Sequence, residues 1–250
     1  MMKTIWCHSF VMGLKASVVG VFLTIFLAAC ATSPAPVVDR QALPEGAFGE
    51  ETANGTQNAP NAVPPQGDFV PDRVFSVCPI QVRNAPPSGQ DRVIPTYGQL
   101  FVVDRVVALA TSPVNGGCLS SGFGRRGERL HKGIDISAPR GSWVYSAAPG
   151  IVREAGWGGS FGYYILIDHG YNIYTRYAHL DAFVEGLDIG SELGFGWPIG
   201  QVGNSSSVTV GVHLHYEVLT GNYATAKKSF GLNAHNPFEY PVYVPPPAES

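Results

Sequence analysis

Short runs of valine, isoleucine and tyrosine separated by glycine constrain the fold of this chain more than any other sequence feature. Between Leu119 and Tyr240 such runs predict seven β-strands: Gly133–Ser137, Trp143–Ala147, Ile151–Ala155, Tyr163–Asp168, Ile173–Ala178, Ile199–Val202 and Leu214–Leu219. The turn His169–Asn172 should close an antiparallel hairpin between two of them. No segment of useful length here has the hydrophobic period of a helix. We therefore predict an all-β domain, an antiparallel β-sheet with a groove on one face.

The charge balance argues against a nucleic-acid partner. The 250 residues include 16 Lys and Arg against 19 Asp and Glu, which gives a formal net charge of -3. No basic excess is present to neutralise phosphates. Because 45% of the residues are hydrophobic, the chain can bury one sizeable core. We expect one medium-sized domain with additional segments.

The first 29 residues have the pattern of an export signal. Lys3 and Lys15 supply positive charge, and a mostly apolar run extends from Ala16 to Ala29. This run is shorter than the roughly 20 residues that a membrane-spanning helix needs, and it suits the apolar core of a signal peptide. Translation from Met12 would leave an equally good signal, so the sequence leaves the start codon open.

The apolar run ends in Leu27-Ala28-Ala29-Cys30, which resembles the lipobox of bacterial lipoproteins. The resemblance implies that Cys30 is lipidated and anchors the chain to a membrane of the cell envelope. Ala31 rather than aspartate follows, which in a Gram-negative cell resembles the pattern sorted to the outer membrane. We expect an anchor in the inner leaflet of the outer membrane, facing the periplasm. An ordinary cleaved signal or an uncleaved anchor is the alternative.

Composition divides the rest of the chain into four parts. Residues 30–68 are rich in alanine, proline, asparagine and glutamine and cannot bury enough apolar surface to offset their ordering entropy, so we expect a flexible tether. Residues 69–118 form a small accessory segment, in which Leu100–Ala110 could be a strand or a short helix. Residues 119–240 form the predicted β-domain, and residues 241–250 form a proline-rich tail.

The four cysteines fit an oxidising compartment. Cys7 lies in the signal and Cys30 is the lipidation candidate, which leaves Cys78 and Cys118 as an even pair. We expect a disulfide between these two, which would join the accessory segment to the β-domain. Two buried free thiols are the alternative. No C-x-x-C spacing occurs, which argues against a cysteine-bound zinc ion.

Three groups of residues in the predicted β-domain have the spacing of metal ligands or of acid–base catalysts. His131 and Asp135 stand four apart across a glycine and can converge on one cation if the chain bends suitably. His213 and His215 alternate in a predicted strand, so both imidazoles point at the same place. His179 ends another predicted strand.

Together these residues describe an open zinc site. Two histidines and one carboxylate leave a fourth tetrahedral position for water, which is the pattern of catalytic zinc. Such a zinc ion would activate the water and polarise a scissile carbonyl. Two further histidines could position the water, move protons and stabilise an oxyanion. Sequence spacing leaves open which member of His213 and His215 binds the metal.

Four motifs follow one another in a specific order: Ser121-Gly122-Phe123-Gly124-Arg125-Arg126, His131-x-x-x-Asp135, Tyr177-Ala178-His179-Leu180 and His213-Leu214-His215-Tyr216-Glu217. This order resembles the lysostaphin-like, LytM-type zinc endopeptidases, which cleave peptide bonds in bacterial cell-wall peptidoglycan. The resemblance covers residues 119–240, about half of the chain.

By position, the resemblance implies that His131, Asp135 and His215 bind one zinc ion. It also implies that His179 and His213 form the catalytic pair outside the ligand set.

The resemblance further implies a reaction, in which zinc-activated water attacks an amide in a peptide cross-link of peptidoglycan. In a Gram-negative host that amide would join a D-alanine to a diamino acid. His169 and His235 match no catalytic position, and we interpret them as a turn residue and a surface residue.

Three other functions stay open. Some relatives that have lost zinc ligands activate separate cell-wall amidases, so a silent or latent regulator with an amidase or divisome partner is the main alternative. A module that binds peptidoglycan without cutting it could line its groove with Tyr163, Tyr164, Tyr174 and Tyr177, although aromatic residues of strands usually pack in the sheet. An amidase or carboxypeptidase would use the same zinc chemistry. The sequence also leaves open whether residues 69–118 cover the groove.

Overall fold

The computed structural model describes residues 69–206, 211–224 and 228–244. The predicted signal, Cys30 and the predicted tether therefore lie outside the described residues, as do residues 245–250 of the predicted tail. In the part of the chain that is described, no helix has both the length and the apolar character needed to cross a membrane.

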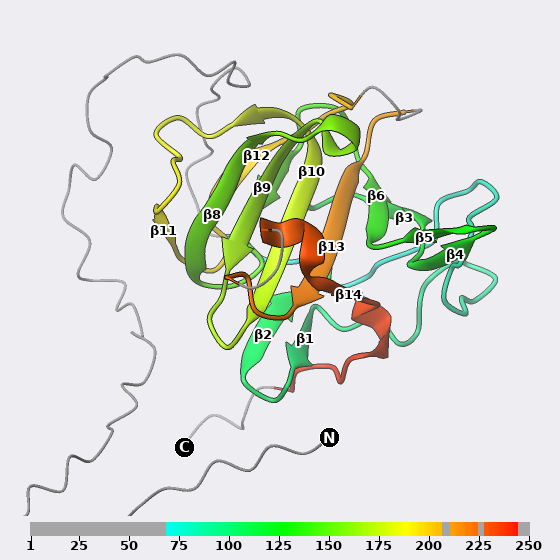
Figure 1. The fold of residues 1–250 in the computed structure, drawn as a ribbon. Coiled ribbons are helices and arrows are strands. Elements are labelled where there is room, and N and C mark those ends of the chain that lie inside the picture. The colour runs from blue at the N-terminus through cyan, green and yellow to red at the C-terminus, as the bar shows by residue number, and fades with distance from the viewer. Residues whose placement is uncertain (1–68, 207–210, 225–227, 245–250) are drawn as a thin grey trace, which may run out of the picture. The chain divides into compact units, whose positions relative to one another are not determined.

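The central element is one antiparallel sheet, in which the described residues supply ten strands (Figure 1). The main path runs β11-β8-β9-β10-β13-β6-β3, while β12 pairs with β10 and β7, and β14 pairs with β13. The strands are β3 (Cys118–Ser121), β6 (Ile134–Ser137), β7 (Trp143–Tyr145), β8 (Gly150–Trp157), β9 (Tyr163–Asp168), β10 (Ile173–Phe183), β11 (Glu192–Leu193), β12 (Pro198–Val202), β13 (Leu214–Thr220) and β14 (Asn233–His235). Each of the seven predicted segments contains a strand of the structure, although Gly133, Ser146 and Ala147 lie outside the strands, and this confirms the all-β prediction.

Smaller elements flank this sheet. Strands β1 (Leu100–Val103) and β2 (Val107–Ala110) form one hairpin, and β4 (Gly124–Arg126) and β5 (Arg129–His131) form another. Three short 3-10 helices complete the elements of the described residues, at Gly159–Phe161, Lys228–Gly231 and Pro237–Glu239.

The segment Leu100–Ala110, which the sequence left open between strand and helix, forms the two strands of the β1–β2 hairpin. Asp104 and Arg105 at its turn have φ values of 48° and 62°. Positive φ at both central residues is the turn geometry whose twist matches that of paired strands. The turn therefore favours the hairpin over a continuous helix.

Strand β10 lies at the centre of the sheet and is covered on both faces. Every residue from Ile173 to Leu180 is buried, as expected for a strand packed on two sides. Tyr177 is fully buried, and its hydroxyl accepts a hydrogen bond from the backbone N–H of Ala147 at 2.8 Å. Tyr174 is 4% exposed. These two tyrosines pack in the sheet rather than lining a groove.

Cys78 and Cys118 form the predicted disulfide, with their Cα atoms 5.0 Å apart. Cys118 begins β3, and Val77 pairs with Leu119 in a parallel bridge. The disulfide therefore fastens residues of the accessory segment to the edge of the main sheet.

Removing this disulfide should destabilise the domain by about 3–4 kcal/mol, because the bridge closes a long loop in the unfolded chain. The sequence separation of 40 residues sets this size. Urea unfolding of the Cys78→Ser/Cys118→Ser variant, compared with the oxidised wild type, measures the loss. Equal unfolding midpoints would show that the bridge does not constrain the unfolded state.

His169 is not the simple turn residue that the sequence suggested, because it is buried at the end of β9. Its Nδ1 lies 2.8 Å from the carbonyl oxygen of Pro149, and its Nε2 lies 2.7 Å from the hydroxyl of Thr175. The Thr175 hydroxyl also contacts that of Tyr177 at 2.9 Å. His235, predicted to be a surface residue, is half-buried in β14. Both histidines complete buried or half-buried polar contacts between strands.

Acidification should destabilise the protein through His169. Burial lowers the pKa of His169 from 6.5 to about 4, so the folded state holds this imidazole neutral. The contribution of His169 to the free energy of unfolding is fully present above pH 6.5. It is lost as the pH falls towards 4, because the unfolded chain then binds a proton that the folded chain does not. Between pH 7.5 and 4.5 the loss is about 2–3 kcal/mol.

Urea unfolding of the wild type and of His169→Gln at both pH values measures this contribution, because glutamine does not titrate there. The variant should lose about 2–3 kcal/mol less stability than the wild type between the two pH values. Parallel pH dependences in the two proteins would contradict the assignment.

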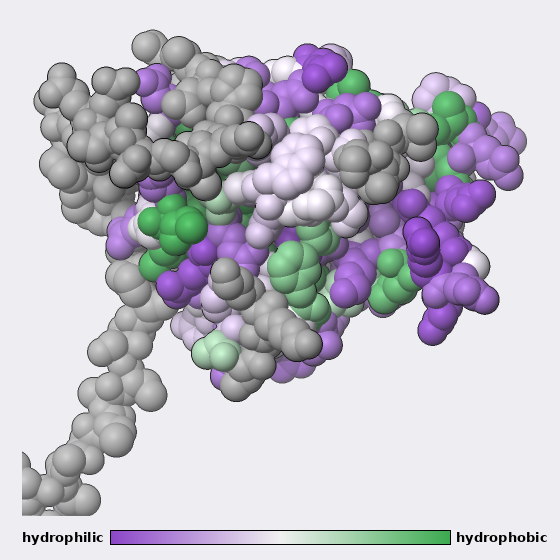
Figure 2. Space-filling view, turned by 45° about the horizontal axis from the view of Figure 1, so that its top comes forward, coloured by the Kyte–Doolittle hydropathy of each residue, from purple (hydrophilic) through white to green (hydrophobic). Residues whose placement is uncertain are grey.

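One face of the molecule carries scattered hydrophobic residues separated by hydrophilic ones (Figure 2). Single exposed apolar residues of this kind are normal on soluble domains and need no partner. Among the described residues that this view shows, the hydrophobic ones do not join into one continuous patch.

Candidate metal centre

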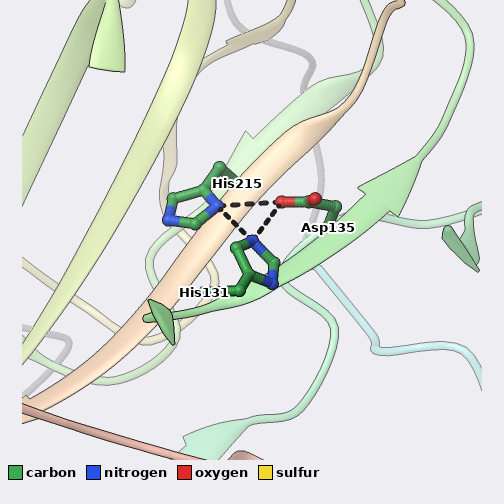
Figure 3. Close-up of side chains that lie close together, drawn as sticks. All are labelled: His131, Asp135 and His215. Carbon is green, nitrogen blue, oxygen red and sulfur yellow. Dashed lines mark hydrogen bonds and ion pairs between the residues drawn. The ribbon is translucent and has the colours of Figure 1, made fainter. Parts of the chain in front are cut away.

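Three side chains converge at the junction of β5, β6 and β13 (Figure 3). In the antiparallel pair β6–β13, Asp135 and His215 are direct register partners, so their side chains share one face of the sheet. His131 ends β5 and reaches the same place from the neighbouring hairpin. The His131 Nε2 atom lies 3.0 Å from Asp135 Oδ1 and 3.1 Å from His215 Nδ1, and these last two atoms lie 2.8 Å apart.

The donor set fits a zinc ion. Imidazole nitrogen and carboxylate oxygen are ligand types that zinc prefers, and donors on a tetrahedral ion with bonds of about 2.0–2.2 Å lie about 3.3–3.6 Å apart. The observed separations of 2.8–3.1 Å need only a small expansion to reach that size. The side chains of the two histidines are 9% exposed and that of Asp135 is 13% exposed, so the donors are shielded yet reachable.

Backbone and side-chain contacts orient His131 and Asp135. The Nδ1 atom of His131 lies 2.8 Å from the carbonyl oxygen of Gly122. When this nitrogen carries the proton and donates to that carbonyl, Nε2 is left free to bind a metal. Arg126 donates to Asp135 Oδ2 at 3.1 Å, which leaves Oδ1 facing the histidines. Arg126 belongs to the first of the four sequence motifs, but the sequence alone indicated no role for it.

The same guanidinium reaches Ser121 Oγ and lies 2.7 Å from His131 Nδ1. A protonated Nδ1 cannot accept from Arg126 while it donates to Gly122. The hydrogen bond to Gly122 is therefore the one compatible with metal binding at Nε2 of His131. Residues of the motif Ser121–Arg126 thus surround and orient His131.

Charge in this cluster favours an anionic Asp135 and a cationic His215 in the absence of a metal. Burial works to raise the pKa of Asp135, but hydrogen bonds from His131 and His215 outweigh it and hold that pKa well below its usual range. Burial works to lower the pKa of His215, but hydrogen bonds to Asp135 and Glu217 raise it to about 9. A metal ion that binds Nδ1 of His215 must therefore displace a proton.

His179 reaches this cluster because of a β-bulge in β10. Its neighbour Ala178 pairs with His215, so in a regular strand His179 would point to the opposite face, towards the core. The register between β10 and β9 shifts between Tyr177 and Leu180, and His179 has a φ of 65°. A bulge of this kind re-aims a side chain, and a non-glycine residue with positive φ is a conformation found at functional sites. The imidazole centroid of His179 lies 5.6 Å from that of His215.

His213 completes the group just before β13. Its ring centroid lies 4.8 Å from that of His179, and its Nε2 lies 3.7 Å from Asp135 Oδ1. The Nδ1 atoms of His179 and His213 each lie 3.1 Å from a backbone carbonyl oxygen, that of Phe161 and of Gly211 respectively. When both Nδ1 atoms donate to these carbonyls, both Nε2 atoms carry lone pairs that can accept a proton.

Burial holds both of these imidazoles neutral. It lowers the pKa of His179 to about 3, with further lowering from the neighbouring His215 and His213. It also lowers the pKa of His213, against the opposing charge of Asp135. Three donor atoms therefore converge beside two neutral imidazoles. The division into zinc ligands and a catalytic pair, which the family resemblance implies, remains a prediction.

A surface hollow of about 810 Å³ lies elsewhere, between the β1–β2 hairpin and residues 240–243. Its lining includes Val102, Ala108, Tyr240 and Tyr243 and none of the five residues of the centre. The groove that the sequence predicts at the metal centre remains a prediction.

Part of the chain is similar in sequence to known peptidases. A DD-carboxypeptidase/endopeptidase, Mpg, of Neisseria meningitidis serogroup B is 41% identical over 107 residues, which is 40% of this chain and 24% of that relative. An L-Ala--D-Glu endopeptidase of Bacillus subtilis is 37% identical over 110 residues, which is 42% of this chain and 33% of that relative. The chain therefore spans about a quarter to a third of the length of these two curated relatives.

Among solved structures, a zinc containing peptidase from Vibrio cholerae is 25% identical, covering 58% of this chain and 47% of that chain with a TM-score of 0.46. Residues 129–227 match the model of Peptidase family M23, a range that contains all five residues of the centre. The chain therefore carries a peptidase family M23 domain.

Proposed function

We propose that this chain is a zinc-dependent endopeptidase that cleaves peptide cross-links of bacterial peptidoglycan. The observation that carries the proposal is the complete constellation within the matched segment: three convergent donors from His131, Asp135 and His215, with His179 and His213 beside them. The names of the relatives support the substrate class, because they include peptidoglycan DD-endopeptidases of Vibrio cholerae that are 34–37% identical over about 90 residues.

The two neutral histidines supply the proton transfers of amide hydrolysis. One Nε2 can accept the proton that a water molecule loses as its oxygen bonds to the amide carbon. The second imidazole can orient the water through its own Nε2 lone pair, and the proton taken up by the first then passes to the departing amine as the C–N bond breaks. Zinc, when bound, would polarise the scissile carbonyl and lower the pKa of a coordinated water. The products are a carboxylate and an amine.

We further propose that lipid on Cys30 holds the domain at the inner leaflet of the outer membrane, with residues 30–68 as the tether. The lipobox resemblance supports this location. Such a tether would let the domain reach a polymer that lies close to the membrane.

Incubation of the full chain in detergent with purified peptidoglycan in ¹⁸O-labelled water tests the function. We expect products that carry one ¹⁸O atom in each new carboxylate, and fragment masses identify the bond cleaved. Labelled products that form only when this protein and a cell-wall amidase are both present, and with neither protein alone, would instead establish the regulator, which is the alternative interpretation of the sequence.

A further inference from the structure

A buried ion pair lies directly behind the candidate ligand His215. The His215 Nε2 atom lies 3.0 Å from Glu217 Oε1, and the other carboxylate oxygen, Oε2, accepts a hydrogen bond from Arg176 Nη1 at 2.5 Å. Glu217 is 1% exposed and Arg176 is 2% exposed. Because burying two charges is costly, a buried ion pair is often no more stable than an apolar pair of similar size. Stability alone is therefore a weak reason for this pair.

The sheet fixes these three side chains on one face. His215 and Glu217 stand two apart on β13, so their side chains point the same way. Arg176 on β10 is the direct register partner of Glu217. The carboxylate therefore stands between the guanidinium and the imidazole, without a loop whose movement could separate them.

Arg176 has few partners besides Glu217. Its guanidinium lies over the ring of Phe161, 4.4 Å from the ring centroid, with Phe230 at 5.8 Å. Its Nε and Nη2 atoms are buried without a hydrogen-bond partner among the described residues. A guanidinium placed in this way serves chiefly to balance the charge of the carboxylate beside it.

We propose that Glu217 is a positioning residue for the metal centre, with Arg176 as its charge partner. Glu217 Oε1 accepts a hydrogen bond from the Nε2–H group of His215. This contact fixes the tautomer in which Nδ1 carries the lone pair. That nitrogen faces Asp135 Oδ1 at 2.8 Å and His131 Nε2 at 3.1 Å. A carboxylate that accepts from a ligating histidine orients the ring and makes it a stronger ligand.

This inference rests on the metal site of the proposed function and deepens it. It assigns the ligand atom of His215 to Nδ1 and gives the final glutamate of the His213–Glu217 motif a role in metal affinity. The sequence alone assigned no role to Glu217.

Two double variants separate positioning from structural support. Arg176→Met/Glu217→Leu and Arg176→Met/Glu217→Gln both replace the ion pair with neutral side chains, which avoids an unpaired buried charge. They differ in one respect, because only glutamine keeps an oxygen that can accept the Nε2 proton. Melting temperatures of the metal-free full-length proteins show whether both variants fold.

Competition with a chromophoric chelator measures zinc affinity without reference to activity. We expect the leucine double variant to bind zinc about 10–100-fold more weakly than the wild type, and the glutamine double variant to lose less than about 10-fold. Equal affinities in the two variants would overturn the inference while leaving the proposed function intact. A wild type that binds no zinc would overturn both, and zinc binding without hydrolysis would overturn the function alone.

A second measurement needs no variant. In the zinc-loaded wild type, ¹⁵N NMR should find the His215 proton on Nε2. A proton on Nδ1 would overturn the inference, whatever the variants do.

Discussion

Replacing His131 with alanine should abolish zinc binding and hydrolysis together. The substitution removes the Nε2 atom that stands 3.0–3.1 Å from the other two donors. It leaves one carboxylate and one imidazole, too few protein ligands for a catalytic zinc site. The loss in zinc affinity should exceed the roughly 10–100-fold that removal of an outer partner causes. Metal analysis of the purified protein should fall from one zinc per chain to none.

His235→Ala is the matched control for this experiment. It removes another half-buried imidazole, one in β14 that contacts Thr220 at 2.7 Å and lies outside the donor group. The control protein should keep its zinc and its activity. A His131→Ala protein that retains either zinc or turnover would contradict the ligand assignment.

Replacing His179 with alanine should leave zinc in place and reduce kcat by about 10²–10⁴-fold, the usual contribution of a positioned general acid or base. His179 supplies none of the three convergent donor atoms, although its ring lies 4.8 Å from that of His213. One zinc per chain together with lost turnover separates proton transfer from metal binding.

The backbone conformation of His179 calls for a glycine variant as a control. His179 has a φ of 65°, which is strained for any residue except glycine, so alanine keeps the strain and removes only the imidazole. His179→Gly removes both, and it should be as inactive as the alanine variant. A glycine or alanine variant that turns over at the wild-type rate would exclude His179 from the reaction.

The strand pattern and much of the centre could be predicted from the sequence. Alternation in a strand was enough to predict that His213 and His215 approach one point, and the strands themselves follow from their β-branched residues. The disulfide followed from the count of cysteines left after the signal and the lipobox. These features depend on local chemistry, which a sequence carries directly.

Features that depend on pairing between strands were not predictable in this way. The register that sets Asp135 opposite His215 is a property of two strands 80 residues apart in the chain. The bulge that turns His179 away from the core needs an extra residue in β10 relative to its neighbour, and no glycine marks it.

The contacts of Arg126 and Glu217 also depend on how strands and hairpins are arranged in space. Arg126 of the β4–β5 hairpin contacts Asp135 of β6, and Glu217 meets Arg176 because β13 pairs with β10. Charged residues in a motif indicate a role only when their neighbours in space are known.

Zinc-dependent cleavage of a defined cross-link tests the central claim most directly. Purified cross-linked muropeptide dimers are incubated with the protein, with the protein plus a zinc chelator, and with the chelated protein after zinc is restored, and mass spectrometry follows the products. We predict conversion of dimers to monomers, its loss with chelator and its return with zinc. Dimers that stay intact with a zinc-loaded protein, or conversion that the chelator does not affect, would contradict the assignment of this chain as a zinc endopeptidase.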